Sequence, residues 1–281
     1  MRALRNVVVV IAAVVLVGVA LAVYRASGDG ASASIVGKGK LRIGVKADQP
    51  RLGLRMRDGK IRGFDVDVAT YIAGGLGVYG DDITWVGLTS DEREKALRDG
   101  TVDMVIATYS ITPERKEQVT FGGPYYVTHQ DILIRTGDRE SIRNVGDLAG
   151  RRLCRAAGSN SWRRVTQERQ VAAKLVPAGS YSECVSALLK GRLDAVSTDD
   201  LILAGFAASP AGSGTEMVGA PFTNEKLGVG LRKGDVAGCE AVNRYLTEMY
   251  QNGTAKTLLS EWFGSVDFDV ATGVPEFEGC A

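Results

Sequence analysis

Apolar positions along the chain recur with two periods, one typical of strands and one typical of helices. Alternating or continuous apolar residues predict strands at 41–45, 83–86 and 102–106. Apolar residues at helical spacing follow the first two strands: one helix opens at Gly63, and another runs from Ser90, as its cap, to a stop at Gly100. The strand–helix–strand–helix order predicts an α/β protein with a parallel sheet and right-handed crossovers.

The same succession of patterns continues through the second half of the chain. Further strands are predicted at 132–134, 152–154, 193–197 and 223–231. Helices are predicted at 144–150, 181–189, 236–250 and 255–262. Because ligands bind at the carboxyl ends of strands in parallel sheets, polar side chains that directly follow the strands are the first candidates for a binding site.

A long apolar segment precedes these elements. The run 7–23 is apolar over 17 residues and follows two arginines, which predicts that the N-terminus stays inside and that the rest of the chain is exported. Within residues 1–26, a cleaved signal and a retained membrane anchor both fit this pattern. A buried core helix fits poorly because the run has no polar face. Residues 27–39 are rich in Gly, Ser and Ala and are expected to form a flexible tether.

Composition argues against several classes of function. The 281 residues suffice for two domains, and the net charge of +1 gives no reason to expect a nucleic acid partner. The single histidine, His129, argues against a histidine-based metal site and against a serine–histidine relay. The four cysteines form no Cys-x-x-Cys pair, so zinc-finger spacing is absent. Their even number fits two disulfides in an oxidising compartment.

The run 107–115 joins the strand at 102–106 to a helix that Pro113 begins. Proline suits the first helical turn, where its missing N–H costs nothing. Thr108 and Ser110 supply hydroxyls, and Arg115 supplies a planar set of donors that binds a carboxylate through two hydrogen bonds. The run therefore predicts an anion cradle for a small carboxylate. The alternative is a strand end followed by a capped helix and a surface arginine.

Polar side chains also follow the other predicted strands, and they should meet at one edge of each sheet. They are Lys46, Ser90 and Arg93 in the first half and Ser159, Asn160 and Asp199 in the second half. Asp199 and Asp200 fit a helix N-cap with a solvated neighbour. Asp199 fits equally well as an acceptor for an ammonium group. An α-amino acid carries a carboxylate and an ammonium group, so Arg115 and Asp199 together would suit it.

The segment ATYSITPERKEQVTFGGPYY, at 107–126, resembles the signature of the polar amino-acid solute-binding proteins of ABC importers. IGVKADQP, GFDVDVATYIA, YSECVSALLKGRLDAVSTDDLILAGF and LGVGLRKGD stand in the order and spacing of that family. The likeness extends from Lys40 to Gly264, which is nearly all of the chain beyond its N-terminal segment. Within the family, the chain is most similar to the glutamate- and aspartate-binding branch.

The resemblance implies a two-lobed periplasmic-binding-protein-like fold of type II, in which each lobe is a mainly parallel sheet flanked by helices. Lobe 1 would comprise 40–130 and 223–265, lobe 2 would comprise 131–222, and 266–281 would form a C-terminal tail. Crossings near 128–132 and 220–225 would form a two-strand hinge on which the lobes close around a ligand. Among the three possible cysteine pairings we expect Cys154–Cys184 and Cys239–Cys280, because each pair then lies within one lobe. Four buried free thiols are the alternative.

The resemblance also implies roles for the residues that surround an α-amino acid's common atoms. Arg115 would clasp the α-carboxylate, and Asp199 would accept the α-ammonium group. The remaining contacts to the carboxylate would come from hydroxyl, amide and backbone groups at Thr108, Ser110, Ser159 and Asn160. Each of these assignments rests on a position of this sequence that matches the family's motif.

Selectivity for the ligand's side chain is expected from a second set of residues. Lys46, Arg93 and Ser90 match positions that hold a distal carboxylate in the acidic branch, and Tyr181 lies near a position that contacts the ligand. Two cations beyond Arg115 favour a dianionic ligand, because a buried unpaired charge is costly. The alternative for Lys46 and Arg93 is solvated surface charge. Arg51 stands where the resemblance leads us to expect glycine, and it would add positive potential or block part of the cleft.

The expected function is that of an extracytoplasmic binding protein, membrane-anchored or secreted, that delivers glutamate, or else aspartate, to an ABC permease. Glutamine and asparagine are less expected ligands. A membrane-anchored amino-acid sensor with the same site is the alternative. We expect a monomer with no cofactor and no metal, and no enzymatic activity, because Asp199 is assigned to an ammonium group and the one histidine falls at the hinge.

Overall fold

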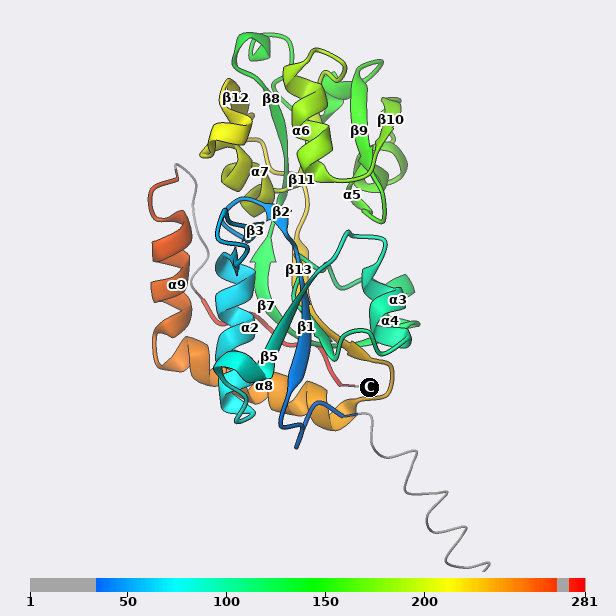
Figure 1. The fold of residues 1–281 in the computed structure, drawn as a ribbon. Helices are drawn as coiled ribbons and strands as arrows, with labels where there is room; N and C mark the ends of the chain where they lie inside the picture. Colours follow the sequence, from blue (N-terminus) through cyan, green and yellow to red (C-terminus); the bar gives the residue numbers. More distant parts are fainter. Residues whose placement is uncertain (1–33, 267–272, 281) are drawn as a thin grey trace, which may run out of the picture. The chain divides into compact units, whose positions relative to one another are not determined.

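A five-stranded sheet forms the centre of lobe 1 in the computed structural model (Figure 1), which describes residues 34–266 and 273–280. Its strands, in spatial order, are β5 (Ile83–Gly87), β1 (Leu41–Val45), β6 (Met104–Val105), β13 (Glu225–Arg232) and β7 (Val119–Thr128). β1 pairs in parallel with β5 and β6, whereas β13 pairs antiparallel with β6 and β7. Only β13 therefore runs against the other strands, and the expectation of a mainly parallel sheet is confirmed for this lobe.

Lobe 2 contains a two-stranded sheet and a three-stranded sheet, and again one strand is reversed. Its strands are β8 (Gln130–Arg135), β9 (Arg152–Ala156), β10 (Lys174–Ala178), β11 (Val196–Asp199) and β12 (Thr215–Met217). The spatial orders are β10–β9 and β11–β8–β12. β9 and β10 are parallel, and a single parallel bridge, Leu153 to Ala195, links β9 to the segment before β11. β8 pairs antiparallel with β11 and β12, so it is the one reversed strand of this lobe.

Helices flank the sheets of both lobes. In lobe 1 they are α2 (Phe64–Gly75), α3 (Arg93–Arg98), α4 (Pro113–Lys116), α8 (Val236–Gln251) and α9 (Thr254–Phe263). In lobe 2 they are α5 (Ser161–Arg163), which continues into a π-helical turn at Arg164–Glu168, α6 (Tyr181–Leu189) and α7 (Asp200–Ala207). Three short strands, β2 (Asp48–Gln49), β3 (Gly53–Arg55) and β4 (Ile61–Arg62), form a small separate sheet. Short 3₁₀ turns occupy Gly80–Asp82, Thr136–Asp138, Val145–Leu148 and Pro210–Gly212.

Two chain connections join the lobes. β7 passes into β8 through His129, and the chain returns from β12 to β13 through residues 218–224. Thr128 pairs with Glu225 on β13, and Gln130, two residues further along, pairs with Asp199 on β11. These connections are the two-strand hinge that the sequence predicts. The start of β13 and the end of β11 both pair with the short stretch 128–130.

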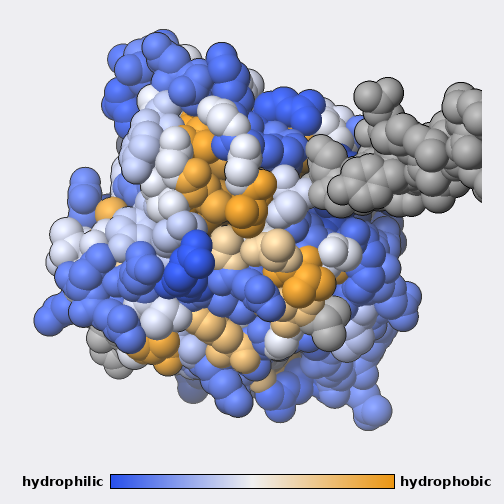
Figure 2. All heavy atoms as spheres, turned by 90° about the horizontal axis from the view of Figure 1, so that it is seen from below, coloured by the Kyte–Doolittle hydropathy of each residue, from blue (hydrophilic) through white to orange (hydrophobic). Residues whose placement is uncertain are grey.

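The C-terminal helices complete lobe 1, although they lie more than 150 positions from α2 in the sequence (Figure 1). α8 and α9 both pack on α2. Their buried residues, among them Leu246, Met249 and Leu259, join the same apolar core as Phe64 and Ile72 of α2. Burial of an apolar face drives this packing at about 25 cal/mol for each Å² removed from water. Figure 2 views the end of lobe 1 opposite lobe 2, where hydrophilic residues surround a smaller hydrophobic area.

Several predicted elements end at other residues than expected, among them two strands that lie next to β1 and β9. The strand predicted at 102–106 is assigned only to Met104–Val105, although Asp103 N and Ile106 N also bond Arg42 O and Gly44 O of β1, at 2.7 and 2.9 Å. The strand predicted at 193–197 forms as Val196–Asp199. The residues before Val196 bond to β9 instead, because Asp194 N and Ala195 N both donate to Arg152 O.

Ser90 does not cap the following helix, so this prediction is wrong. α3 begins at Arg93, and its N-cap position is Glu92. The hydroxyl of Ser90 instead accepts a hydrogen bond of 2.7 Å from Lys46 Nζ, and its carbonyl accepts one of 3.0 Å from Arg93 Nε. The side chains of Lys46 and Arg93 therefore bind the hydroxyl and the carbonyl that Ser90 would use as a helix cap.

The two disulfides are those expected. Cys154 of β9 is bonded to Cys184 of α6, and Cys239 of α8 is bonded to Cys280 near the C-terminus. The second disulfide holds the end of the tail on lobe 1, where Glu278 N also donates to Gly123 O at 2.9 Å. The alternative of four buried free thiols is therefore wrong.

The predicted signal or anchor segment, most of the tether and residues 267–272 of the tail lie outside the described residues. Among the residues that are described, no helix combines the length and the apolar character that a membrane span requires. The boundaries that we predict for the two lobes remain a prediction.

Candidate functional site

A small pocket lies where the two lobes meet. Lobe 1 contributes Ser90, Arg93, Thr108, Ser110 and Arg115. Lobe 2 contributes Ser159, Asn160, Ser161, Tyr181, Thr198, Asp199 and Ile202. The fold thus gathers every predicted ligand residue except Lys46 around one space. Ser161, Thr198 and Ile202 were not predicted. The first two adjoin predicted residues in the sequence, whereas Ile202 gives no polar signal.

Arg115 reaches the pocket from a short helix that is fixed at its start. Thr112 Oγ1 caps α4 by accepting a hydrogen bond of 3.3 Å from Arg115 N, and Pro113 stands at the first helical position, as predicted. The Arg115 guanidinium donates to Ser110 O at 2.8 Å and to Gly158 O of lobe 2 at 3.0 Å. Its Nε lies 3.4 Å from Glu94 Oε1. Arg115 is buried, so the alternative of a surface arginine is wrong.

Arg93 forms a second buried cation next to Arg115. Only 2% of Arg93 is exposed, which rules out solvated surface charge. It donates to Ala107 O at 3.0 Å and to Thr108 O at 3.2 Å. The ring of Tyr109 lies under both guanidinium groups, with its centre 4.4 Å from Arg93 Cζ and 5.1 Å from Arg115 Cζ. Burial, and then repulsion by Arg115, lowers the pKa of Arg93 to about 10, so the arginine stays charged at neutral pH.

Lys46 lies behind the pocket and reaches it through Ser90. Its side chain is buried, and its amine donates to Ser90 Oγ at 2.7 Å and to Leu88 O at 3.4 Å. Both acceptors are uncharged. Burial, and then repulsion by Arg93, lowers the pKa of Lys46 to about 7. The alternative of solvated charge is therefore wrong for Lys46 as well, and a nearby anion would stabilise its charged form.

The backbone of Thr108 has an unusual conformation that a buried carboxylate holds in place. Thr108 has a φ of 45°, which is rare for a residue with a branched side chain. Asp65 accepts hydrogen bonds of 2.8 Å from Thr108 N and from Tyr125 OH, and Gln49 Oε1 accepts one of 3.0 Å from Thr108 Oγ1. Burial raises the pKa of Asp65 to about 7. Sequence reasoning missed Asp65 and Gln49, because their contacts are 43 and 59 residues away along the chain.

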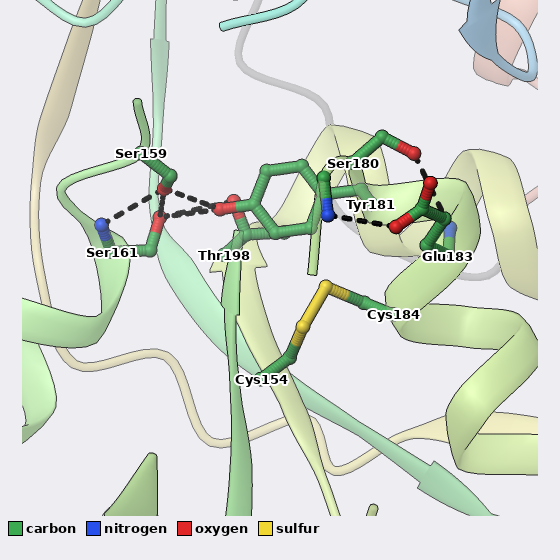
Figure 3. The surroundings of a disulfide bond; sticks show 9 residues. Cys154, Ser159, Ser161, Ser180, Tyr181, Glu183, Cys184 and Thr198 are labelled. Carbon is green, nitrogen blue, oxygen red and sulfur yellow. Dashed lines mark hydrogen bonds between the residues drawn. A yellow bond between two sulfur atoms is a disulfide. The ribbon is translucent and has the colours of Figure 1, made fainter. Parts of the chain in front are cut away.

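In lobe 2, four hydroxyl groups form a connected network (Figure 3). Tyr181 OH lies 2.6 Å from Ser159 Oγ and donates to Ser161 Oγ at 2.9 Å, and Ser161 Oγ donates to Thr198 Oγ1 at 3.1 Å. The Cys154–Cys184 disulfide joins β9, which leads to the Ser159 loop, to α6, which carries Tyr181. The disulfide therefore fixes the two elements from which these hydroxyls project.

Asp199 is the acidic group of the pocket. It ends β11 at the N-cap position of α7, but its side chain makes no capping hydrogen bond with that helix. It is 4% exposed, and its pKa is raised well above 3.8 by burial and by the negative charges of Glu225 and Asp200. Asp200 is buried rather than solvated, and its carboxylate accepts hydrogen bonds from Thr128 Oγ1 and His129 N. Of the alternative of an N-cap with a solvated neighbour, only the N-cap position of Asp199 is found, because its side chain does not cap the helix and Asp200 is buried.

Arg51 takes no part in the pocket. Its φ of 67° is the left-handed conformation that favours glycine, which agrees with the residue expected at this position. Its guanidinium donates to Trp262 O and to Ser265 Oγ, near the end of α9. The charge therefore binds a helix of lobe 1, and neither of the two expected effects on the cleft is found.

The two lobes touch each other around the pocket. Ser182 Oγ of lobe 2 donates to Asp48 O of lobe 1 at 2.8 Å. A Cβ atom added to Gly158, whose φ is +67°, would lie 2.2 Å from Asp91 N and 2.5 Å from Ser90 C across the cleft. This close approach of two backbones defines a closed arrangement, in which glycine is required at position 158.

The chemistry of the pocket is that of a receptor for a small zwitterion. Arg93 and Arg115 line the pocket from lobe 1, with Lys46 behind them on Ser90, and one carboxylate, Asp199, lines it from lobe 2. Hydroxyl groups from both lobes fill the space between them. Among the described residues, no cluster of histidine, cysteine and carboxylate side chains could hold a metal ion.

Comparison with known proteins agrees with this geometry. Residues 41–265 match the family described as bacterial extracellular solute-binding proteins, family 3. The glutamate-binding protein GluB of Corynebacterium efficiens is 39% identical over 277 residues, which cover 94% of this chain and 92% of GluB.

Two solved structures share the fold. An ancestral arginine-binding protein bound to arginine is 35% identical, with a TM-score of 0.74 over 81% of this chain and 99% of its own. The ancestral amino acid-binding protein AncCDT-1, a precursor of cyclohexadienyl dehydratase, is 32% identical, with a TM-score of 0.71 over 80% of this chain and 96% of its own. These likenesses agree with the two-lobed architecture described above.

Proposed function

This chain belongs to the family 3 bacterial extracellular solute-binding proteins, and from that premise we propose that it captures an acidic α-amino acid between its lobes, glutamate before aspartate. The observation that carries the proposal is that Arg93 and Arg115 share one pocket with Asp199, while Lys46 lies directly behind Ser90 of the same pocket. The similarity to GluB, which is named for glutamate binding, supports the same ligand. Delivery of the ligand to an ABC permease on the outer side of the membrane is the role that we infer from the family.

The number of buried cations supports a ligand with two carboxylates. Arg115 and the hydroxyls of Thr108 and Ser110 would hold the α-carboxylate, and Asp199 would hold the α-ammonium group. Arg93 and Lys46 would then remain without an anionic ligand group if the ligand's side chain were neutral. Because burial of an unpaired charge is costly, a distal carboxylate stabilises this set of side chains better than an amide does.

The pocket groups support binding rather than catalysis. Asp199 is needed for the ammonium group, and His129 lies at the hinge, where its Nδ1 is 3.4 Å from Asp200 Oδ2. Neither residue is free to act as a general base toward a bound amino acid. The glutamate-binding relative supports the same reading.

Calorimetric titration of the purified protein with glutamate, aspartate, glutamine and arginine tests the proposal. We expect saturable binding of glutamate, weaker binding of aspartate, and still weaker binding of glutamine. Preference for glutamine or arginine would contradict the acidic ligand while leaving the family role intact. Failure of all four amino acids to bind the folded protein would contradict the proposed function and favour a sensor with another ligand.

The preference for glutamate over glutamine is expected to depend on pH. Lys46, with its pKa lowered to about 7, carries more positive charge below pH 7, and Asp65, with its pKa raised to about 7, then carries less negative charge. Both changes favour a second carboxylate. The ratio of the glutamate affinity to the glutamine affinity should therefore rise as pH falls from 8.5 to 6. Above pH 7 the rise should be at most about tenfold for each pH unit, because uptake of one proton on binding changes an affinity by that factor.

The ratio of the glutamate affinity to the glutamine affinity is not affected by protonation of Asp199, because both ligands carry the same ammonium group. The side chain of Lys46 also experiences the charges of Arg93, Asp48 and Asp91. The Lys46→Gln variant should bind glutamate more weakly and lose most of the pH dependence of the ratio, and Lys46→Arg should keep the charge at every pH. A ratio that is constant with pH in the natural protein would contradict the role of Lys46.

Lobe closure is expected to be essential for tight binding, and Gly158→Ala tests it. The added methyl group meets backbone atoms of Ser90 and Asp91 in the other lobe, so it should hold the lobes apart and weaken glutamate binding at least about tenfold, which is about 1.4 kcal/mol. Gly150→Ala is the matched control. Its φ of +72° imposes similar backbone strain, but a Cβ there meets nothing within 4 Å. Equal affinities of the two variants would contradict the requirement for closure.

A further inference from the structure

Two buried guanidinium groups meet at one point beside the pocket. Arg93 Nη2 lies 3.5 Å from Gly158 O, and Arg115 Nη2 donates to the same carbonyl at 3.0 Å. In the described part of the chain, the other acceptors of the Arg93 guanidinium are also uncharged carbonyls. Arg115 Nε lies 3.4 Å from one carboxylate oxygen, Glu94 Oε1. These partners leave an excess of positive charge, and like charges repel strongly where water is excluded.

The aromatic ring of Tyr109 is a further partner that both cations share. Its centre is 4.4 Å from Arg93 Cζ and 5.1 Å from Arg115 Cζ. Both distances lie within the range of about 6 Å in which the face of a ring attracts a cation. Tyr109 is fully buried, and this attraction is largest for cations that water does not surround. Tyr109 is not among the residues that line the pocket, so it would act on a ligand through the two arginines.

Strands β13 and β7 hold the ring in its place. Tyr109 O accepts a hydrogen bond of 2.9 Å from Gly228 N. Gly230 leaves room for the ring, because a Cβ atom there would lie 2.8 Å from Tyr109 Cε1. The ring of Phe121 meets that of Tyr109 nearly edge-on, with 4.7 Å between the ring centres. These contacts fix the ring with its position relative to the two guanidinium groups.

The hydroxyl of Tyr109 does not account for this arrangement. It is buried and close enough to Glu94 to experience its charge, but it forms no hydrogen bond with any described residue. Burial raises the pKa of the phenol well above its ordinary value, so the phenol stays neutral and supplies no counter-charge. A buried hydroxyl without a partner costs stability. The ring is therefore the part of this side chain that favours the two cations.

We propose that Tyr109 is a positioning residue that sets ligand specificity, because its ring holds Arg93 and Arg115 side by side for a ligand with two carboxylates. This inference rests on the proposed function, in which Arg115 binds the α-carboxylate and Arg93 binds the distal one. Glutamate would use both arginines, whereas glutamine would use only Arg115. Loss of the ring should therefore weaken glutamate binding more than glutamine binding.

Calorimetric titration of the full-length protein with glutamate and with glutamine tests the proposal. Tyr109→Phe keeps the ring and should bind both ligands within about twofold of the natural protein, because the lost hydroxyl has no partner. Tyr109→Leu removes the ring, and each lost cation–π contact should cost about fivefold in affinity. Glutamine binding should then weaken about fivefold and glutamate binding about 25-fold, because glutamate depends on both contacts.

A graded series separates attraction to the ring from the space that the ring fills. Phenylalanines with one, two and three fluorine atoms at position 109 keep the shape of the ring but progressively weaken the negative potential of its face. Relative to Tyr109→Phe, the glutamate affinity and its ratio to the glutamine affinity should fall with each added fluorine. A ring that only fills space would leave both constant. The series also decides the question if Tyr109→Leu does not fold in thermal denaturation.

Tyr245→Leu is the matched control. The ring of Tyr245 lies 4.7 Å from Arg244 Cζ, on α8, which contributes no residue to the pocket, so this variant should leave both affinities unchanged. Equal losses for the two ligands in Tyr109→Leu, or constant affinities along the fluorinated series, would overturn the proposal. So would a loss in Tyr109→Phe as large as that in Tyr109→Leu. In each case glutamate binding by the natural protein preserves the proposed function, and its absence would overturn both.

Discussion

Replacing Arg115 by alanine is expected to weaken glutamate binding by about 100-fold or more. Arg115 reaches the pocket from a fixed helix start, with Thr112 as cap and Pro113 at the first position, and it is expected to bind the α-carboxylate. Removal of one partner from a buried, hydrogen-bonded charge pair costs about 2–5 kcal/mol. Calorimetric titration of Arg115→Ala with glutamate measures the effect directly.

Two controls separate the loss of a specific contact from general damage. Arg115→Lys keeps the positive charge but lacks the planar set of donors, so its affinity should lie between those of the natural protein and Arg115→Ala. Arg98→Ala removes an exposed arginine of α3, and its affinity should be unchanged. A loss of less than about threefold in Arg115→Ala would contradict the assignment of Arg115 to the α-carboxylate.

Replacing Asp199 by asparagine should have opposite effects on binding and on stability. The amide offers no negative charge to the ligand's ammonium group. Because hydrogen bonds to charged groups contribute about 1.5–3 kcal/mol, glutamate affinity should fall about 10- to 100-fold. The ligand-free variant, however, should be more stable at neutral pH than the natural protein.

The sign of the stability change follows from the pKa of Asp199. The pKa of this carboxyl is raised well above 3.8 in the folded protein, first by burial and then by Glu225. Above about pH 4 the unfolded chain therefore ionises this carboxyl more readily than the folded chain does, and the folded state loses stability as pH rises to the raised pKa. Asparagine does not titrate, so the variant escapes this loss.

Thermal denaturation without ligand, at pH 4 and pH 7, measures this effect. The melting temperature of Asp199→Asn should exceed that of the natural protein at pH 7 by about 2–4 °C for each kcal/mol, and the difference should shrink at pH 4. Asp81→Asn, at an exposed position, is the matched control and should change neither stability nor affinity. Lower stability of Asp199→Asn at pH 7 would mean that Asp199 is held by favourable contacts in the free protein.

Much of the fold could be predicted from local patterns. The helix predicted at 181–189 forms with these bounds, and those predicted at 236–250 and 255–262 form within one residue. Such helices have an apolar face of regular period and clear end signals. Strand ends were less accurate, because a strand ends where its partner ends, and the partner of residues 194–199 changes from β9 to β8 within the segment.

The candidate site could be predicted only in part. Residues that lie close together in the sequence were found, whereas residues that meet only through distant parts of the chain were missed. Thr108, Ser110 and Arg115 stand within eight residues of one another, so one run of sequence indicated them. Asp65 and Gln49 fix the backbone of Thr108 from distant positions, and nothing near them in the sequence indicates this.

The sequence by itself determined the types and order of the elements, the family resemblance and the residues that could bind an amino acid, because these depend on local periodicity and residue chemistry. The tertiary structure decided which of these side chains are buried and what their charges face. Lys46 reads as an ordinary lysine in the sequence, yet burial next to Arg93 lowers its pKa to about 7. Desolvation and Coulomb interactions depend on distances in space, and those distances exist only after the chain has folded.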